Sequence, residues 1–109
     1  MNKNLHDAVF HSLEMTSAES TTITITLSYH PSEDSRVRML GRVVIANVTS
    51  FCSTVDLARQ ARHASFGNIA DWSPSKKRGQ TFFHLAGGTI SIFGDAPVVE
   101  DINQPWSTM

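Results

Sequence analysis

The sequence predicts an α+β fold: a twisted antiparallel sheet of about five strands with one helix packed on one face, in the order strand, strand, strand, helix, strand, strand. Three observations support this prediction. Residues 21–31 alternate apolar and polar side chains, residues 36–50 form a second segment rich in β-branched side chains, and residues 53–67 repeat alanine at helical spacing. Since the two extended segments are neighbours in sequence, we expect them to pair as a long β-hairpin.

Length and composition predict a single domain spanning residues 1–109. The chain has 109 residues, of which 40% are hydrophobic and 17% are charged, and cores of roughly 100–150 residues are the commonest size. Nine basic and ten acidic side chains give a net charge of −1. This balance argues against a nucleic-acid partner, because binding to phosphates usually needs a positive excess.

The compartment is predicted from cysteine usage and from apolar runs. Cys52 is the one cysteine, which excludes an internal disulfide and suits a reducing environment. No apolar run near the N-terminus has the length of a secretory signal, and no segment approaches the roughly 20 apolar residues that span a bilayer. We therefore expect a cytoplasmic protein that does not contact membranes.

The first element, residues 5–15, satisfies neither the helical nor the strand period cleanly. Val9, Leu13 and Met15 share one parity, which favours a strand over a helix. Residues 16–20 (TSAES) then predict a polar turn.

The predicted hairpin follows. Its first strand, residues 21–31, places hydroxyl side chains on one face and apolar side chains on the other, namely Ile23, Ile25, Leu27 and Tyr29. Pro31 and the polar residues after it end this strand. In the return strand, Gly41 predicts a bulge or a close backbone approach. Beyond Gly41 both parities are apolar, so we expect this half to be covered on both faces.

The predicted helix begins at Ser53, where Ser53 and Asp56 resemble a capping box. Ala58, Ala61 and Ala64 belong to its apolar stripe. Gly67 and Asn68 are expected to end the helix, or a short second turn carries Ile69, Ala70 and Trp72.

Two short strands close the predicted sheet. Residues 80–86 and 89–93 are expected to form a hairpin turning at Gly87 and Gly88, since both glycines tolerate positive φ. Residues 94–97 break the last strand, and Val98 and Val99 are candidates to continue it. Trp106 in the final segment either docks through its ring or frays.

Candidate catalytic and metal-binding residues are few. His6-Asp7 resembles the metal-binding pair of HD phosphohydrolases, but those enzymes collect further ligands from several helices, so a structural role is the favoured interpretation. The five histidines show no close ligand spacing. We therefore predict no catalytic residue, no metal ligand and no cofactor, and keep a small enzyme or ligand pocket using His6, Asp7 and His84 as an alternative.

Arginines are the candidate partner-binding residues. Arg36, Arg38 and Arg42 would form a cationic stripe beside the threonine face of residues 21–31 if the strand register aligns them. Guanidinium groups pair bidentately with carboxylates or phosphates, so such a stripe suits an acidic partner. The alternative is a solvated sheet face, with the basic residues 76–78 in a soluble loop.

Two segments carry a resemblance to known proteins. Leu5-His6-Asp7-Ala8, followed by Ser12-Leu13-Glu14 and residues 21–27, resembles the opening of small bacterial β-rich, immunity-protein-like families and related uncharacterised domains. Residues 83–92 are similar to their closing hairpin. The resemblance implies a protein without catalysis, and for some relatives the neutralisation of a cognate toxin by binding.

Taken together, these observations predict a protein-binding module that is not an enzyme, with Arg36, Arg38 and Arg42 as the preferred contact. The alternative is self-association, because amphipathic strands leave sheet edges that a homodimer could pair.

Overall fold

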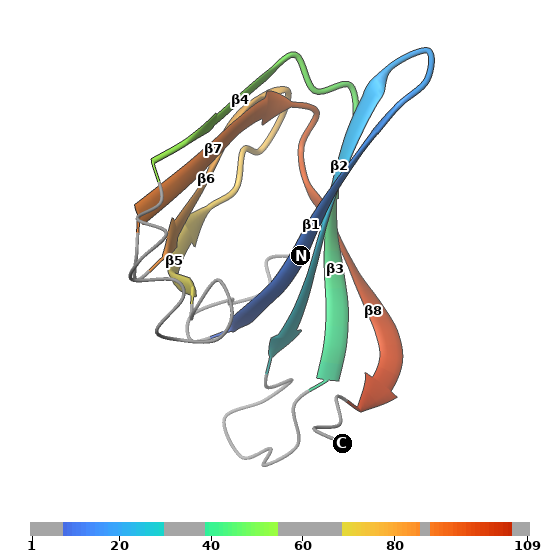
Figure 1. Ribbon diagram of the computed structural model, residues 1–109, viewed down its shortest axis with the longest axis vertical. Coiled ribbons are helices and arrows are strands. Elements are labelled where there is room, and N and C mark those ends of the chain that lie inside the picture. The colour runs from blue at the N-terminus through green and yellow to red at the C-terminus, as the bar shows by residue number, and fades with distance from the viewer. Residues whose placement is uncertain (1–7, 30–38, 55–68, 86–87, 106–109) are drawn as a thin grey trace.

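The computed structural model describes residues 8–29, 39–54, 69–85 and 88–105. These residues form eight strands and no helix, arranged in two four-stranded antiparallel sheets that face each other (Figure 1). The predicted α+β fold, with one five-stranded sheet and a packed helix, is therefore wrong. Antiparallel pairing, which was part of that prediction, is present in both sheets.

The first sheet has the strand order β1-β2-β3-β8. It consists of β1 (Val9–Ser17), β2 (Thr21–Tyr29), β3 (Met39–Ile45) and β8 (Val98–Pro105). The predicted pairing of the two central segments is confirmed: Ile23 lies opposite Ile45, and Tyr29 opposite Met39. The predicted first strand is confirmed as β1, which pairs with β2. It continues to Ser17, so the predicted turn at residues 16–20 is shorter, since Thr16 and Ser17 belong to the ladder.

The second sheet has the order β4-β7-β6-β5. It consists of β4 (Ser50–Ser53), β5 (Ile69–Ser73), β6 (Gly79–Leu85) and β7 (Gly88–Gly94). The predicted closing hairpin is confirmed as β6 and β7. Its turn is shifted by one residue, because Leu85 lies opposite Gly88 and the connecting residues are therefore 86 and 87. Gly88 has a φ of 153°, a conformation that favours glycine.

The predicted return strand, residues 36–50, is in fact two elements. β3 ends at Ile45, residues 46–49 cross to the second sheet, and β4 begins at Ser50. Asn47 has a φ of 52°, a left-handed conformation that asparagine tolerates better than most residues. The predicted coverage of both faces is wrong for β3: Val43 and Ile45 are buried, whereas Arg42 is exposed and Val44 is half-buried on the other face.

The predicted helix falls mainly on residues 55–68, which lie outside the described part of the chain. Its predicted N-terminus is contradicted, because Ser53 is the last residue of β4 and lies opposite Ile90 of β7. Trp72, placed by one alternative in a helical turn, belongs to β5 opposite Phe83. Val98 and Val99 begin a strand of the other sheet and do not extend β7. Trp106 lies outside the described residues.

The core lies between the two sheets. Side chains from the inward faces of both are fully or nearly buried: Phe10, Ile23, Ile25, Leu27, Val43, Ile45, Ile69, Phe83, Ile90 and Ile92. All four predicted apolar positions of β2 are buried, as the period of two requires. Thr81 is a buried polar residue, and its Oγ1 accepts a hydrogen bond from the Ser75 backbone N–H at 3.2 Å.

Gly41 fulfils both alternatives predicted for it. The β3–β8 register shifts between Met39 and Gly41, so the ladder is irregular there. A Cβ at position 41 would stand 2.8 Å from Cε1 of Tyr29 and 3.2 Å from the carbonyl oxygen of Glu100. The missing side chain therefore leaves room for the buried tyrosine ring.

Two connections cross between the sheets side by side. The β3–β4 connection carries the chain out of the first sheet, and the β7–β8 connection brings it back. The Asp95 backbone N–H donates to the carbonyl oxygen of Ala46 at 2.9 Å, which joins the two connections directly. A Cβ on Gly94 would stand 2.9 Å from that same oxygen, so glycine permits the close approach.

Candidate interaction surfaces

The outward face of the second sheet groups aromatic side chains from neighbouring strands. Inward positions of β6 and β7 are buried, and the alternate residues face solvent. Since residues directly opposite each other share a face, the register groups eight outward residues across β4, β7 and β6: Ser50, Cys52, Gln80, Phe82, His84, Thr89, Ser91 and Phe93. We call this set the aromatic face.

Phe82 and His84 form the centre of the aromatic face. Their rings are stacked, with centroids 6.3 Å apart and planes within 3° of each other. His84 Nδ1 lies 3.3 Å from Thr89 Oγ1 on β7, a hydrogen bond that fixes the imidazole against the sheet. Phe82 lies opposite Ser91, which in turn lies opposite Cys52. The face is thus an aromatic patch bordered by hydroxyl and thiol groups.

His84 was predicted as a candidate in an alternative pocket with His6 and Asp7. His6 and Asp7 lie outside the described residues, and His84 is exposed on the aromatic face. Asp71 lies opposite His84 in the β5–β6 ladder. The Asp71 Oδ1 atom accepts a hydrogen bond from the Trp72 backbone N–H at 2.9 Å, so this carboxylate is bound locally to its own strand.

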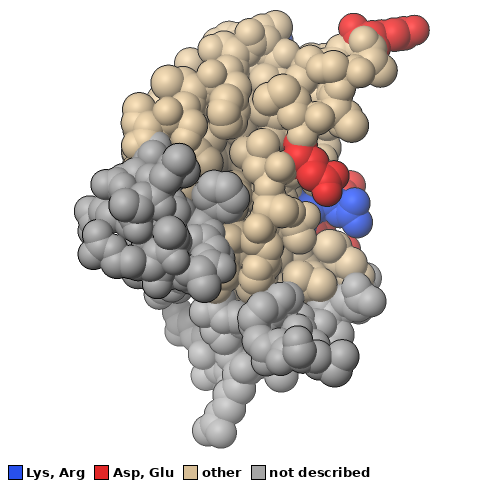
Figure 2. All heavy atoms as spheres, viewed as in Figure 1, with Lys and Arg blue, Asp and Glu red and all other residues tan. Residues whose placement is uncertain are grey.

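Arg42 lies on the outward face of the first sheet. The register places Arg42 opposite Thr26 of β2 and opposite Glu100 of β8, so its predicted position beside the threonine face is confirmed. Its Nε lies 3.6 Å from Glu100 Oε1 in an exposed ion pair. Figure 2 shows basic atoms bordered by acidic atoms on this side of the molecule. Arg36 and Arg38 lie outside the described residues, and their contribution to the predicted stripe stays a prediction.

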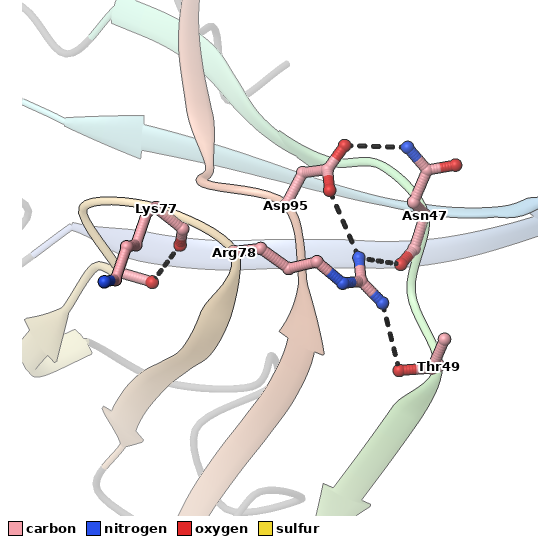
Figure 3. Close-up of polar contacts among 6 residues, drawn as sticks. Asn47, Thr49, Lys77, Arg78 and Asp95 are labelled. Atoms are coloured by element: carbon pink, nitrogen blue, oxygen red, sulfur yellow. Dashed lines mark hydrogen bonds and ion pairs between the residues drawn. The ribbon is translucent and has the colours of Figure 1, made fainter.

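Arg78, predicted as part of a soluble basic loop, binds both crossing connections (Figure 3). Its Nη1 donates to the carbonyl oxygen of Asn47 at 2.7 Å and lies 3.1 Å from Asp95 Oδ1. Its Nη2 donates to Thr49 Oγ1 at 3.3 Å, while Asn47 Nδ2 donates to Asp95 Oδ2 at 2.7 Å. We call Arg78, Asn47, Thr49 and Asp95 the crossover cluster. Its contacts hold the two crossing connections together.

The crossover cluster also borders the aromatic face. The Arg78 Cζ atom lies 5.3 Å from the centroid of the Phe93 ring, a cation–π arrangement. In the same loop, the Ser75 hydroxyl donates to the Lys77 carbonyl oxygen. The loop before β6 is therefore held in place at one end of the aromatic face.

A shallow depression lies at the β1–β2 turn. It has a volume of about 450 Å³ and is lined by Thr16, Ala18, Glu19, Ser20 and Thr22. Its single carboxylate and its hydroxyl groups do not form a metal site. Within residues 8–29, 39–54, 69–85 and 88–105, no group of three or more His, Cys, Asp or Glu side chains is placed to hold a metal ion. The described residues also contain no helix that is long and apolar enough to span a membrane.

Comparison of the chain with family models, with curated proteins and with solved structures found no match. The resemblance to immunity-protein-like families therefore stays a prediction from the sequence. The aromatic face itself was missed by sequence reasoning. Its signal was present in the alternation of residues 80–84 and 89–93, which places Phe82, His84 and Phe93 on the face opposite to the core.

Proposed function

We propose that this chain is a non-enzymatic protein-binding module that acts in the cytoplasm and contacts its partner through the aromatic face. The observation that carries the proposal is Phe82, a phenylalanine with 36% of its surface exposed on a regular strand. Exposed aromatic side chains and arginines are enriched where proteins bind one another. The cytoplasmic setting is supported by the single exposed thiol of Cys52.

The geometry around Phe82 supports a preorganised contact. Its ring is stacked on His84, which is hydrogen-bonded to Thr89, and all three lie on paired strands. A surface that is already ordered loses little conformational entropy on binding. The hydroxyl groups of Ser91 and Thr89 supply the polar border that interfaces usually place around an apolar centre.

A protein is the partner class that fits this surface. The resemblance found in the sequence implies a cognate toxin as that protein, and its neutralisation would follow from occlusion of the toxin by the aromatic face. Arg36, Arg38 and Arg42 are the competing contact surface, because an acidic partner would be attracted to the outward face of the first sheet. The two surfaces lie on opposite sheets and can be tested separately.

The experiment compares variants of the two surfaces. The tagged chain is used to isolate a partner from the source cells, and the dissociation constant is then measured by calorimetry with both proteins purified. We expect Phe82→Ala to raise the dissociation constant at least about tenfold, since truncating a central aromatic residue removes more than about 1.4 kcal/mol of binding free energy.

The control is the double variant Arg38→Glu, Arg42→Glu, which we expect to bind within about threefold of the unmodified chain, because charges at a distance from the contact have small effects. Circular dichroism verifies that each variant is folded. Strong loss of binding in the arginine double variant with unchanged binding of Phe82→Ala would refute the aromatic face and assign the contact to the first sheet.

A further inference from the structure

β4 differs from the other edge strands of the described sheets. β1 has a register shift between Phe10 and Ser12, and β5 has one between Ile69 and Asp71. β8 carries acidic side chains and ends at a proline. Natural edge strands use such irregularities, charges and prolines to block pairing with other chains. β4, with the sequence Ser-Phe-Cys-Ser, has none of these, and all four of its residues are exposed.

The register of β4 determines which of its backbone groups face away from β7. The Thr54 N–H donates to the carbonyl oxygen of Thr89 at 3.0 Å, so Thr54 continues the ladder as a hydrogen-bonded pair. Backbone groups alternate in direction along an antiparallel strand. Ser50 and Cys52 therefore direct their N–H and C=O groups toward β7, whereas Phe51 and Ser53 direct theirs to the outer edge of the sheet.

We propose that β4 is a dimerisation edge, and that its occupant is β4 of a second copy of this chain, paired antiparallel about a two-fold axis. In the register that centres the axis on Cys52, each Phe51 lies opposite Ser53 of the other copy. These two pairs exchange about four backbone hydrogen bonds. The same register places Ser50 opposite Thr54 of the other copy, so the whole segment 50–54 is paired.

The chemistry of β4 is self-complementary. The strand has no charged side chain, so two copies approach without the repulsion that like charges cause. Phe51 is 40% exposed and lies opposite the buried Ile92, on the core-facing side of the sheet. In the proposed register the two Phe51 rings are diagonal neighbours on that side, within reach of each other. Dimerisation thus covers apolar surface that each chain leaves in water.

A disulfide between the two Cys52 residues would identify this register. Two Cys52 residues facing each other as a non-hydrogen-bonded pair have Cα atoms about 4.5 Å apart, which lies within the range of roughly 4.4–6.8 Å found for disulfides. Oxidised glutathione can then convert the two thiols into one disulfide, and it is itself reduced to two glutathione thiols that take up both protons. A neighbouring register, with Cys52 opposite Ser50 or Thr54, would not bring the sulfur atoms together.

The first test measures molar mass by light scattering over a range of concentrations up to several hundred micromolar. We expect the unmodified chain to reach twice its 12.0 kDa mass. Phe51→Lys places a charge at the paired edge, and we expect it to raise the dimer dissociation constant more than tenfold. The matched control is Phe82→Lys, the same substitution at an exposed phenylalanine of the aromatic face, which we expect to dimerise like the unmodified chain.

The second test uses oxidised glutathione with the folded chain. We expect a covalent dimer that is lost in Cys52→Ser and reduced several-fold in Phe51→Lys, while Cys52→Ser retains the noncovalent dimer. Ser53→Pro removes a backbone donor from the outer edge only, and should also give a monomer if Phe51→Lys misfolds.

A monomeric unmodified chain throughout the concentration range would overturn the proposal. So would a dimer that persists in both Phe51→Lys and Ser53→Pro, or one that is lost in Phe82→Lys alone. The outcome can be distinguished from partner binding by the aromatic face, because Phe51→Lys and Ser53→Pro alter residues outside that face, whereas partner binding is tested with Phe82→Ala.

Discussion

The contacts of Arg78 could not be predicted from the residues next to it in the sequence. Arg78 follows Lys76 and Lys77 in one basic run, and charge alone does not distinguish the three. The structure turns the Arg78 guanidinium toward Asn47 and Asp95, which are distant in sequence. No local pattern predicts such partners, because they meet only when the two crossing connections come together.

Loss of the Arg78 side chain should destabilise the fold measurably. Arg78→Ala removes hydrogen bonds to Asn47 and Thr49, and we expect the free energy of unfolding to fall by about 1–2 kcal/mol. The exposed ion pair with Asp95 adds little to this value. Urea denaturation followed by fluorescence gives the measurement.

The matched control for Arg78→Ala is Lys77→Ala, one residue away in the same exposed loop. We expect its free energy of unfolding to change by less than about 0.5 kcal/mol. Equal effects of the two substitutions would mean that general loop charge, and not the crossover cluster, stabilises this region.

At the scale of elements, the alternation of apolar and polar residues predicts the strands that pair with a neighbour in sequence. β2 and the β6–β7 hairpin were predicted because their apolar residues follow a period of two and their turns are short. β4 was missed because the run from β3 into β4 contains no proline or glycine between residues 46 and 49. β5 was missed because Ile69 and Trp72 follow an alanine-rich stretch that favours a helix. In both cases tertiary contacts with the second sheet override local preference.

The alternation of buried and exposed side chains along β6 can be tested with two neighbouring phenylalanines. Phe83 is fully buried and stacks on Trp72 with ring centroids 5.7 Å apart, whereas its neighbour Phe82 faces solvent. We expect Phe83→Ala to lower the free energy of unfolding by about 3–5 kcal/mol, since it opens a cavity in the core. Thermal denaturation by calorimetry measures this change.

For Phe82→Ala the corresponding loss should stay below about 1 kcal/mol, because little packing is removed from an exposed position. A reversed order of the two effects would show that β6 presents the opposite face to the core. Intact stability of Phe82→Ala also validates its use in binding measurements.

At the scale of the whole molecule, sheet membership was the part that the sequence could not predict. β3 pairs with β8 and β4 pairs with β7, although the partners are far apart along the chain. Amphipathic strands specify which side faces a core, but not which neighbour completes the sheet. The candidate site could not be predicted in full for the same reason, because it depends on which strands are neighbours. Arg42 could be placed beside the threonine face, yet the assembly of Cys52, Ser91 and Phe82 into one surface required the strand order.

The two-sheet arrangement predicts the pattern of amide hydrogen exchange. Central strands β2, β3, β6 and β7 have hydrogen-bonded neighbours on both sides. We expect their amides to exchange slowly, near the rate of global unfolding. Those of β5 should exchange faster, because β6 is its only ladder partner among the described strands; the exception is the Ile69 N–H, which donates to the carbonyl oxygen of Ala8 at 2.7 Å. Exchange followed by NMR at a concentration that keeps the chain monomeric provides the comparison. Uniform protection of β5 and β6 would contradict the assigned edge.

The place of β8 has a consequence for how the protein is made. While a nascent chain still lacks residues 98–105, β3 has only β2 beside it, and its far side stays open to other strands. Of the described strands, β8 leaves the ribosome after all the others, whereas its three partners in the first sheet are made before β4. Any pause in translation after β7 prolongs the period in which a chaperone, or another unfinished copy, can occupy the place that β8 will take.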